Sequence, residues 1–334
     1  MHLRLYVEDD DQLKDDNQPE DEVQFESVQS QASHSTAEDH LLGQYIPLHY
    51  HFNMLQDQRR VGAFAEAIKA VIKPNMHVVE LGGGTAILSW LAAQQGARVT
   101  CVERNPALVW SSHELLEKNL HGDRVSVVEA DARDYVPIEP VDVVICEMLH
   151  VGLLREKQLE VIQAFKQHYH TAFGKQAPLP KFLPEATTML VQPVQFSYDF
   201  AGYHAPLPLF QDPATVDSRT IELGEFTTYA NIFYDQNFPT SFDCTIDLEV
   251  AQPGALTGLR FATQNLITIL LDQQRGIPWA NQLLVLPVKD PVEVAAGEKI
   301  HVEFTYQAGG TLESLIDTLS VEVRSNLNAK AIGR

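Results

Sequence analysis

Apolar runs alternate with helical segments between residues 77 and 169, and this alternation constrains the fold more than any other feature. The apolar runs are HVVEL followed by GGG, RVTCVER, VSVVEADA and VDVVICEM. Their nearly uniform apolar character is typical of strands that are buried on both faces of a sheet. The segments between them carry apolar residues at helical spacing. The short connections therefore predict a parallel sheet with helices on both faces, which is an α/β domain.

The segments on either side of this region differ from it. Residues 53–72 carry apolar residues at roughly helical spacing and predict one amphipathic helix, which Lys73-Pro74-Asn75 ends. From Ala186 onward, Pro and Gly separate short strand-like runs: ATTMLVQPVQF, FTTYANIFY, FDCTIDLEV, NLITILLD, QLLVLPV, KIHVEFTYQ and LSVEVR. These runs predict an antiparallel β-sandwich or barrel. We expect a tail over residues 1–39, the α/β domain over 40–183 and the β domain over 184–334.

Acidic residues dominate the charge of the 334-residue chain, whose formal net charge is −21. Within residues 1–39, twelve Asp and Glu face only Arg4 and Lys14. This segment has few apolar residues to bury, so we expect it to be disordered. A negative field repels phosphate backbones and attracts cations. The charge therefore argues against nucleic acid as a substrate and favours a basic partner, although a merely solvated acidic surface is the other interpretation.

The three cysteines, Cys101, Cys146 and Cys244, form neither a disulfide pattern nor a zinc pattern. This usage predicts a reducing, cytoplasmic compartment. The chain shows no signal segment and no apolar run long enough for a membrane span, so we expect no membrane partner. His49, His51, His168 and His170 are not spaced as a metal site, and we expect no metal.

The stretch VVELGGGTAIL is the most informative motif, because a strand here meets Gly82, Gly83 and Gly84 directly before a helix. Glycines allow a tight turn and bring the backbone close to a ligand. The dinucleotide fingerprint G-x-G-x-x-G fails, because Ile87 occupies its last position when counted from Gly82.

Acidic residues at successive strand ends indicate a different nucleotide. Glu80 precedes the glycines and suits a ligand that carries an ammonium group. Glu103 closes the next strand, where it can accept hydrogen bonds from two ribose hydroxyls. Asp131 ends the third strand and, with Ala132, falls near where an adenine would lie. This series predicts S-adenosylmethionine as the cofactor.

From about Leu41 onward the chain resembles the protein arginine N-methyltransferases. The segment HFNMLQDQRR is similar to that family's H-x-x-M-L-x-D-x-x-R motif, and ELGGGTAILSW is similar to its first motif. The resemblance implies a Rossmann-like class I methyltransferase domain followed by a β-barrel. It also implies that Tyr45 and Met54 lie on a helix folded over the cofactor, and that Arg60 pairs with the cofactor carboxylate.

The stretch CEMLHVGLLRE carries the most specific likeness. The family places two glutamates nine residues apart after the fourth strand, as are Glu147 and Glu156. Two carboxylates can bind a planar guanidinium bidentately and fix one of its nitrogens. The resemblance implies that Glu147 and Glu156 are the catalytic pair. A simpler interpretation makes Glu156 a first-turn helix residue that the helix dipole favours.

Two departures from the family leave the acceptor open. The family's W-M-G-Y within this loop is Met148 to Val151 here, and its Thr-His-Trp loop aligns with Ile277-Pro278-Trp279. In the family that histidine pairs with the acid that matches Asp57. Pro278 cannot act in this way, and His150 is the candidate to compensate.

We expect the acceptor to be a guanidino nitrogen, in a basic protein or a small molecule. The alternatives are another nitrogen or oxygen nucleophile, or a cofactor-binding scaffold without activity. The apolar segment GYHAPLPLFQDP (residues 202–213) marks a stretch near residues 200–214 that resembles a dimerisation arm and implies a homodimer. The alternative is a loop that folds onto its own domain.

Overall fold

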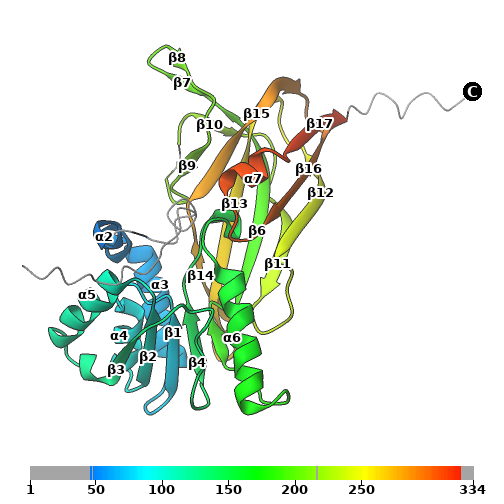
Figure 1. Cartoon of the computed structure of the whole chain (residues 1–334). Coiled ribbons are helices and arrows are strands. Elements are labelled where there is room, and N and C mark those ends of the chain that lie inside the picture. Colours follow the sequence, from blue (N-terminus) through cyan, green and yellow to red (C-terminus); the bar gives the residue numbers. More distant parts are fainter. Residues whose placement is uncertain (1–45, 47, 216, 325–334) are drawn as a thin grey trace, which may run out of the picture. The chain divides into compact units, whose positions relative to one another are not determined.

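The computed structural model describes residues 46, 48–215 and 217–324 (Figure 1). The predicted acidic tail and Tyr45 lie outside these residues. Among the described residues, no helix has both the length and the apolarity that crossing a membrane requires.

A five-stranded parallel sheet forms the first domain. Its order is β3 (Val125–Glu129), β2 (Arg98–Glu103), β1 (His77–Leu81), β4 (Val143–Cys146) and β5 (Lys181–Leu183). The strand order reverses between β1 and β4. In open α/β sheets, ligands bind outside the carboxyl ends of the strands at such a switch point.

Helices cover both faces of this sheet. Alternate strand residues such as Val78 and Val143 pack with α3 (Gln58–Val71) and α4 (Ile87–Gln94). Their neighbours Val79 and Val144 pack with α6 (Gln158–Phe173) on the other face. The helix α5 (Pro106–Glu117) follows β2, and the short turns η1 (Gly122–Arg124) and η2 (Val151–Leu153) complete this domain.

The second domain is built on antiparallel strands. The larger sheet has seven strands: β10 (Thr220–Glu222), β6 (Ala186–Phe196), β13 (Gly254–Leu270), β15 (Leu283–Val294), β9 (Leu209–Gln211), β11 (Thr227–Phe233) and β14 (Arg275–Ala280). The smaller sheet contains β12 (Ser241–Glu249), β16 (Lys299–Gln307) and β17 (Ser320–Arg324). The remaining elements are the hairpin β7 (Asp199–Phe200) and β8 (Tyr203–His204), the turn η3 (Leu271–Gln273) and the helix α7 (Leu312–Ile316). The predicted α/β domain followed by an antiparallel β domain is confirmed.

The prediction of one helix over residues 53–72 is wrong. The segment forms two helices, α2 (Leu48–Gln56) and α3, and Asp57 separates them with a non-helical ψ of 86°. The Asp57 carboxylate accepts a hydrogen bond from the Arg60 amide at 3.0 Å. An N-cap bond of this kind satisfies one of the free amides at a helix start, so the chain turns here although the apolar spacing continues.

The predicted dimerisation arm is divided into two parts. The β7–β8 hairpin projects away from the rest of the chain in Figure 1, and Tyr203 on it is 74% exposed. The following part folds onto its own chain, because β9 pairs with β15. Asp212 also forms an ion pair with Arg59 of α3 at 2.9 Å.

Candidate active site

The glycine turn forms a close backbone cradle at the end of β1. Gly82 and Gly84 have φ of +74° and +56°, which favours glycine. A Cβ on Gly83 would lie 2.2 Å from the Cys101 sulfur, and one on Gly84 would lie 2.9 Å from the His51 ring. The neighbouring Cys101 and His51 side chains therefore leave no room for a Cβ at Gly83 or Gly84.

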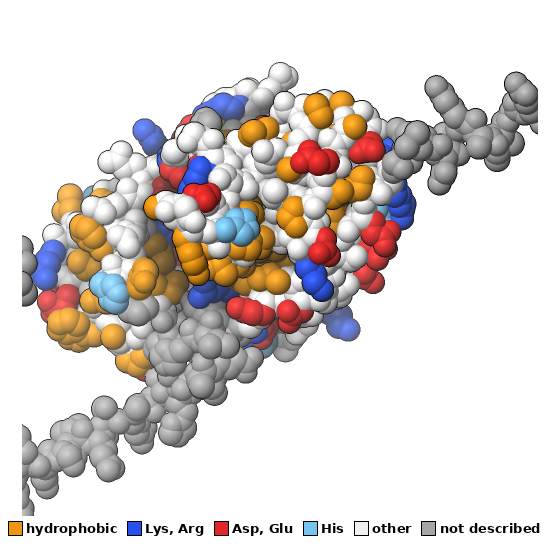
Figure 2. All heavy atoms as spheres, turned by 90° about the horizontal axis from the view of Figure 1, so that it is seen from above, with side chains coloured by type: hydrophobic (Ala, Val, Ile, Leu, Met, Phe, Trp, Pro, Cys, Tyr) orange, Lys and Arg blue, Asp and Glu red, His pale blue; other side chains and the backbone are white. Residues whose placement is uncertain are grey.

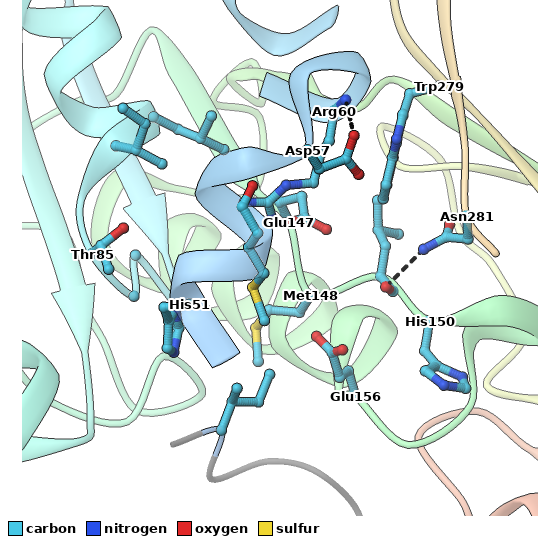
Figure 3. A pocket seen from close by; sticks show the side chains of 18 of the residues that line it. His51, Asp57, Arg60, Thr85, Glu147, Met148, His150, Glu156, Trp279 and Asn281 are labelled. Atoms are coloured by element: carbon cyan, nitrogen blue, oxygen red, sulfur yellow. Dashed lines mark hydrogen bonds and ion pairs between the residues drawn. The ribbon is translucent and has the colours of Figure 1, made fainter. Parts of the chain in front are cut away.

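A cavity of about 1450 Å³ opens beside this turn, at the switch point of the sheet. Nearly all residues that the sequence predicted for the site line it: Met54, Arg60, Glu80, Gly82, Gly84, Glu103, Asp131, Ala132, Glu147 and Glu156. Tyr45 lies outside the described residues. The β domain contributes the far wall through β14 and the residues that follow it (Figure 3).

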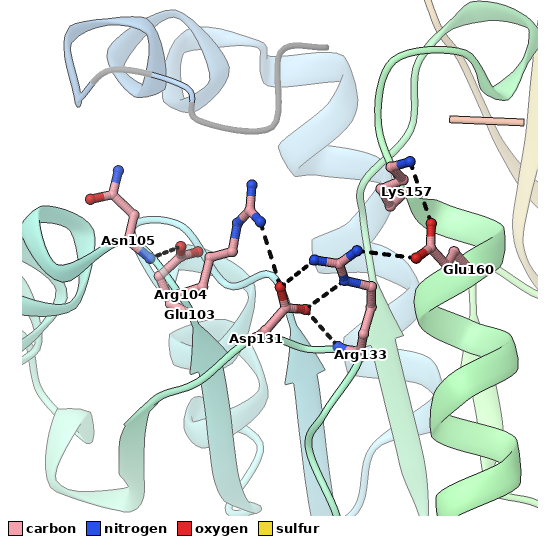
Figure 4. Close-up of polar contacts among 7 residues, drawn as sticks. All are labelled: Glu103, Arg104, Asn105, Asp131, Arg133, Lys157 and Glu160. Atoms are coloured by element: carbon pink, nitrogen blue, oxygen red, sulfur yellow. Dashed lines mark hydrogen bonds and ion pairs between the residues drawn. The ribbon is translucent and has the colours of Figure 1, made fainter. Parts of the chain in front are cut away.

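Glu103 is buried at the end of β2 and braces the glycine turn. One of its carboxylate oxygens accepts from the Gly84 amide at 2.9 Å, and the other accepts from the Asn105 amide at 2.8 Å (Figure 4). A carboxylate oxygen can accept more than one hydrogen bond. Glu103 can therefore hold the turn and still accept from the hydroxyl groups of a ligand.

Asp131 lies two residues beyond the end of β3 rather than at its end, because β3 stops at Glu129. Arg133 donates to its carboxylate at 3.0 and 2.7 Å, and Arg104 lies at 3.5 Å (Figure 4). Burial would raise the pKa of Asp131, but the bonds from Arg133 and the charges of both arginines hold that pKa below its ordinary value. Asp131 is thus a charged, well-anchored acceptor beside the cavity.

Glu80 is buried at the base of the glycine turn. It accepts hydrogen bonds from the amide of Ser89, at 2.8 Å, and from the hydroxyl of Ser89. Burial raises its pKa to about 7 against these bonds. Glu80 therefore ties β1 to α4, and it lines the cavity from this fixed position.

Two buried nitrogen atoms beside the turn have no partner among the described residues: His51 Nε2 and Arg60 Nε. Unpaired buried polar groups are costly, and they mark places where a ligand can supply the missing bond. His51 was not among the predicted cofactor residues. His51 is the first residue of the H-x-x-M-L motif, and this was the available signal. Only the fold shows that its ring lies against Gly84.

The segment from Glu147 to Glu156, which we call the glutamate loop, places both carboxylates in the cavity (Figure 3). Glu147 forms a buried ion pair with Arg60. Burial raises the pKa of Glu147, and the Arg60 charge opposes that rise. Burial, and then the like charge of Glu147, raise the pKa of Glu156 to about 8. The two carboxyl groups therefore retain a proton to a higher pH than ordinary glutamates do.

The alternative role of Glu156 as a first-turn helix residue is wrong. The helix α6 begins at Gln158, with Lys157 as its N-cap, so Glu156 precedes the helix. Its neighbours Leu153 and Arg155 have φ of +54° and +64°. Such left-handed backbone is uncommon for residues other than glycine, and surrounding contacts must hold it in place.

The β domain supplies several of those contacts. Gly152 donates its amide to the Thr263 hydroxyl at 2.7 Å and accepts from the Tyr306 hydroxyl at 2.9 Å. Arg155 donates its amide to the Gly310 carbonyl at 2.7 Å. The glutamate loop thus emerges from the first domain and is shaped by the second.

His150, which the sequence offers in place of the missing family histidine, lines the cavity. Burial lowers its pKa to about 4, and its ring Nδ1 lies 3.2 Å from the Val151 carbonyl. The ring packs edge-on against Phe210 at 5.6 Å. Ile277-Pro278-Trp279 lies within the strand β14 rather than in a loop, and forms an apolar part of the cavity wall.

Comparisons with known proteins agree with this geometry. Residues 78–171 match the family described as Methyltransferase domain. A protein of Methanothermobacter thermautotrophicus, itself uncharacterized, is 28% identical over 276 residues, which cover 80% of this chain and 95% of that protein. Protein arginine N-methyltransferase 1 of Saccharomyces cerevisiae is 30% identical over 139 residues, 40% of each chain. Arginine N(omega)-methyltransferase of Streptomyces achromogenes is 29% identical over 124 residues, 36% of this chain and 34% of that protein.

Two solved structures share the fold. The Trypanosoma brucei PRMT1 enzyme–prozyme heterotetrameric complex with AdoHcy has a TM-score of 0.61 at 16% identity, over 82% of this chain and 96% of that chain. Arabidopsis thaliana protein arginine methyltransferase 10 has a TM-score of 0.62 at 17% identity, over 79% and 89%. With its switch-point cavity and glycine turn, this chain is a class I methyltransferase, a class that uses S-adenosylmethionine. Within that class it is a divergent, arginine-methyltransferase-like protein, as its sequence predicts.

Proposed function

We propose that the protein transfers a methyl group from S-adenosylmethionine to a guanidino nitrogen of arginine, in a protein or in a small molecule. The observation that carries this proposal is the pair of buried carboxylates, Glu147 and Glu156, in one cavity with the glycine turn. Two carboxylates match the planar fork of a guanidinium better than they match a neutral hydroxyl or a single amine.

The cofactor residues follow from the same cavity. The unpartnered nitrogens of His51 and Arg60 suit the carboxylate of a methionine moiety. Glu103 suits the ribose hydroxyls, and Asp131 with Ala132 suits the adenine. When bound, the cofactor supplies an electrophilic methyl group on a sulfonium ion.

The chain's own residues orient and polarise the acceptor. Carboxylates on two sides of a guanidinium localise its positive charge on the bound nitrogens and leave more lone-pair character on the third. That nitrogen forms the new N–C bond, and the electron pair of the broken S–C bond stays on sulfur. Once the guanidinium has displaced the proton that the empty site holds, the Glu156 carboxylate can accept the proton that the attacking nitrogen loses. Positioning and the exclusion of water account for the rest of the rate.

One observation favours an acceptor other than a guanidine. The cavity wall at Ile277-Pro278-Trp279 is apolar and offers no histidine beside Asp57. A different nitrogen or oxygen nucleophile would suit such a wall if the glutamate pair were not needed.

A labelling experiment distinguishes these acceptors. The purified protein is incubated with methyl-labelled cofactor and, in turn, cell extract, arginine-rich peptides and free arginine. Acid hydrolysis followed by mass spectrometry should find the label on methylated arginine, and Glu147→Gln should abolish it. Label on another residue, retained by Glu147→Gln, would overturn the guanidino proposal but leave methyl transfer intact. Cofactor binding without any labelling would favour the inactive scaffold.

A homodimer is the second part of the proposal. The β7–β8 hairpin and the segment after it expose Tyr203 and Leu207, which are 74% and 65% exposed. Apolar residues of α2 are also exposed: Leu48, Tyr50, Phe52 and Leu55. On the face in Figure 2, apolar side chains lie among acidic and basic ones. The free cysteines are consistent with the reducing, cytoplasmic compartment that we propose.

Light scattering after gel filtration tests the dimer. A double substitution, Tyr203→Ser with Leu207→Ser, should convert the dimer to a monomer. Leu271→Ser, at an 82% exposed site after β13, is the control and should leave the mass unchanged. A monomeric wild-type protein would show that the hairpin has another role.

A further inference from the structure

A ring of buried polar side chains begins and ends on adjacent residues of the glutamate loop. At one end, the Met148 amide donates to Gln158 Oε1 at 2.9 Å. At the other end, the Leu149 carbonyl accepts from Asn281 Nδ2 at 2.9 Å. Three side chains connect Gln158 to Asn281, in the order Tyr234, Thr187 and Asn265.

The bonds of this ring all run in one direction. The Gln158 side chain interacts with the Tyr234 hydroxyl and opposes the rise in the pKa of Tyr234 that burial causes. The Thr187 hydroxyl lies 2.7 Å from that hydroxyl and donates its single proton to Asn265 Oδ1 at 2.8 Å. Tyr234 is therefore the donor to Thr187. Asn265 Nδ2 then donates to Asn281 Oδ1 at 2.7 Å. Hydrogen bonds aligned in this way polarise and strengthen one another.

The ring connects the two domains through side chains that are shielded from water. Gln158 is the first residue of α6 in the first domain, whereas Thr187 and Asn265 lie on β6 and β13 of the second. All five side chains are buried, and the most exposed of them, Asn281, is 8% accessible. Buried polar groups are costly unless they are hydrogen-bonded, so breaking one link leaves its neighbours unpaired.

Gln158 also fixes both sides of Glu147. Besides accepting from the Met148 amide, it donates from Nε2 to the Cys146 carbonyl at 2.8 Å. These contacts hold the residues directly before and after Glu147. The position of the Glu147 backbone is therefore set by Gln158 and, through the ring, by the β domain.

We propose that the ring positions Glu147, with Gln158 and Asn281 as the residues that hold the glutamate loop and Thr187 as the link between them. This inference rests on the proposed function, because it assigns these residues to the geometry of the acceptor site. None of the three needs to contact the acceptor. Each acts through the backbone of the loop.

Thr187 is the best place to test the ring, because it lies in the middle and does not touch the loop. Thr187→Val keeps the shape and removes the hydroxyl, whereas Thr187→Ser keeps the hydroxyl. The matched control is Thr257→Val, on the neighbouring strand β13 of the second domain, where Thr257 bonds only to the backbone of Phe196, at 2.7 and 3.0 Å. Asn281→Asp, which replaces the donor to Leu149 with an acceptor, is a second variant at the end of the ring.

Two measurements are made on the full chain. The first is hydrogen exchange of the Met148 amide by NMR, which needs no acceptor. The second is kcat/KM for the guanidino acceptor, together with the Kd for S-adenosylhomocysteine. We expect Thr187→Val and Asn281→Asp to exchange Met148 at least tenfold faster and to lose at least tenfold in kcat/KM. Cofactor Kd should stay within twofold. Thr187→Ser and Thr257→Val should resemble the wild type in all three.

Unchanged Met148 exchange in folded Thr187→Val and Asn281→Asp would overturn the inference. So would equal losses in Thr187→Val and Thr257→Val, because that result would indicate general destabilisation. Faster exchange in a protein that methylates no guanidine would support the ring while counting against the proposed acceptor.

Discussion

Arg60 and Glu147 form a buried ion pair that joins α3 to the glutamate loop. The same arginine is expected to bind the cofactor carboxylate, so one guanidinium borders both the cofactor and the acceptor. Removing one partner of a buried pair leaves an uncompensated charge. We therefore expect substitutions at Glu147 to destabilise the cofactor-free protein more than the cofactor-bound protein.

Cofactor binding is tested at Glu103. Glu103→Gln keeps the size of the side chain but removes the charge that faces the ribose site and the Gly84 amide. Charge-assisted bonds contribute about 1.5–3 kcal/mol, so the Kd for S-adenosylhomocysteine should rise by roughly 10- to 150-fold. Isothermal titration calorimetry measures this change. An unchanged Kd would remove Glu103 from the binding site.

Acceptor turnover is tested at the two glutamates. Glu147→Gln and Glu156→Gln should each lower kcat/KM for the acceptor by two to four powers of ten, or about 3–5 kcal/mol. Glu160→Gln is the control, because Glu160 is exposed on the first turn of α6 and should keep its activity. Steady-state kinetics with labelled cofactor measure all three. Wild-type rates in both loop variants would place the acceptor elsewhere.

The raised pKa of Glu156 predicts how stability depends on pH. An ordinary glutamate has a pKa of 4.5, whereas Glu156 has a pKa of about 8 in the folded protein. Between these values the unfolded chain has lost the proton that the folded chain keeps. The contribution of Glu156 to the free energy of unfolding is therefore complete below about pH 4.5, and it is lost as the pH rises through 8. Thermal melts should show Tm falling over this window, and the fall should be smaller in Glu156→Gln. Parallel curves for the two proteins would contradict this assignment.

The same groups predict the pH dependence of activity. The acceptor needs an ionised pair, so kcat/KM should rise with pH to a plateau above about 8. The rise should shift to lower pH when Glu147→Gln removes the like charge, if residual turnover can be measured. No limb from His150 is expected near pH 6–7, because its pKa is about 4.

The glycine turn predicts opposite effects at two glycines. Gly83→Ala places a Cβ 2.2 Å from the Cys101 sulfur and should lower the free energy of unfolding by more than about 1 kcal/mol. Gly62→Ala, in the interior of α3 with nothing within 4 Å, should raise it by about 0.5–1 kcal/mol. Urea denaturation compares the two. Equal effects would contradict the backbone cradle at residues 82–84.

Much of the fold could be predicted because its signals are local. Strands β1, β2 and β4 and the glycine turn each carry their signal in one short stretch of sequence, and Glu147 and Glu156 lie only nine residues apart. The edge strand β3 is not buried on both faces as its apolar residues predict. The break at Asp57 was not predicted, because the apolar spacing continues through it. Half of β13 was missed for a similar reason: Gly254 and Gly258 interrupt its pattern, although neighbouring strands pair with it throughout.

The hydrogen-bonded ring could not be predicted from the sequence. Thr187 and Asn265 are separated by 78 residues, and only strand pairing brings them together. The partner of Arg60 is similarly distant, 87 residues away. Burial, which raises the pKa of Glu156, likewise depends on how the two domains close around the loop.

A carboxyl pair that holds a proton at neutral pH should affect the enthalpy of ligand binding as well as the rate of methyl transfer. A guanidinium that enters between Glu147 and Glu156 should expel that proton into solution, where the buffer absorbs it. The binding enthalpy of an arginine-containing ligand should therefore differ between phosphate and Tris. The difference should equal the number of released protons multiplied by the difference between the ionisation enthalpies of the two buffers. The affinity of the ligand should not differ. The number of protons released per ligand bound would then give the number of protons that the carboxyl pair holds in the empty site. This measurement needs no methyl transfer.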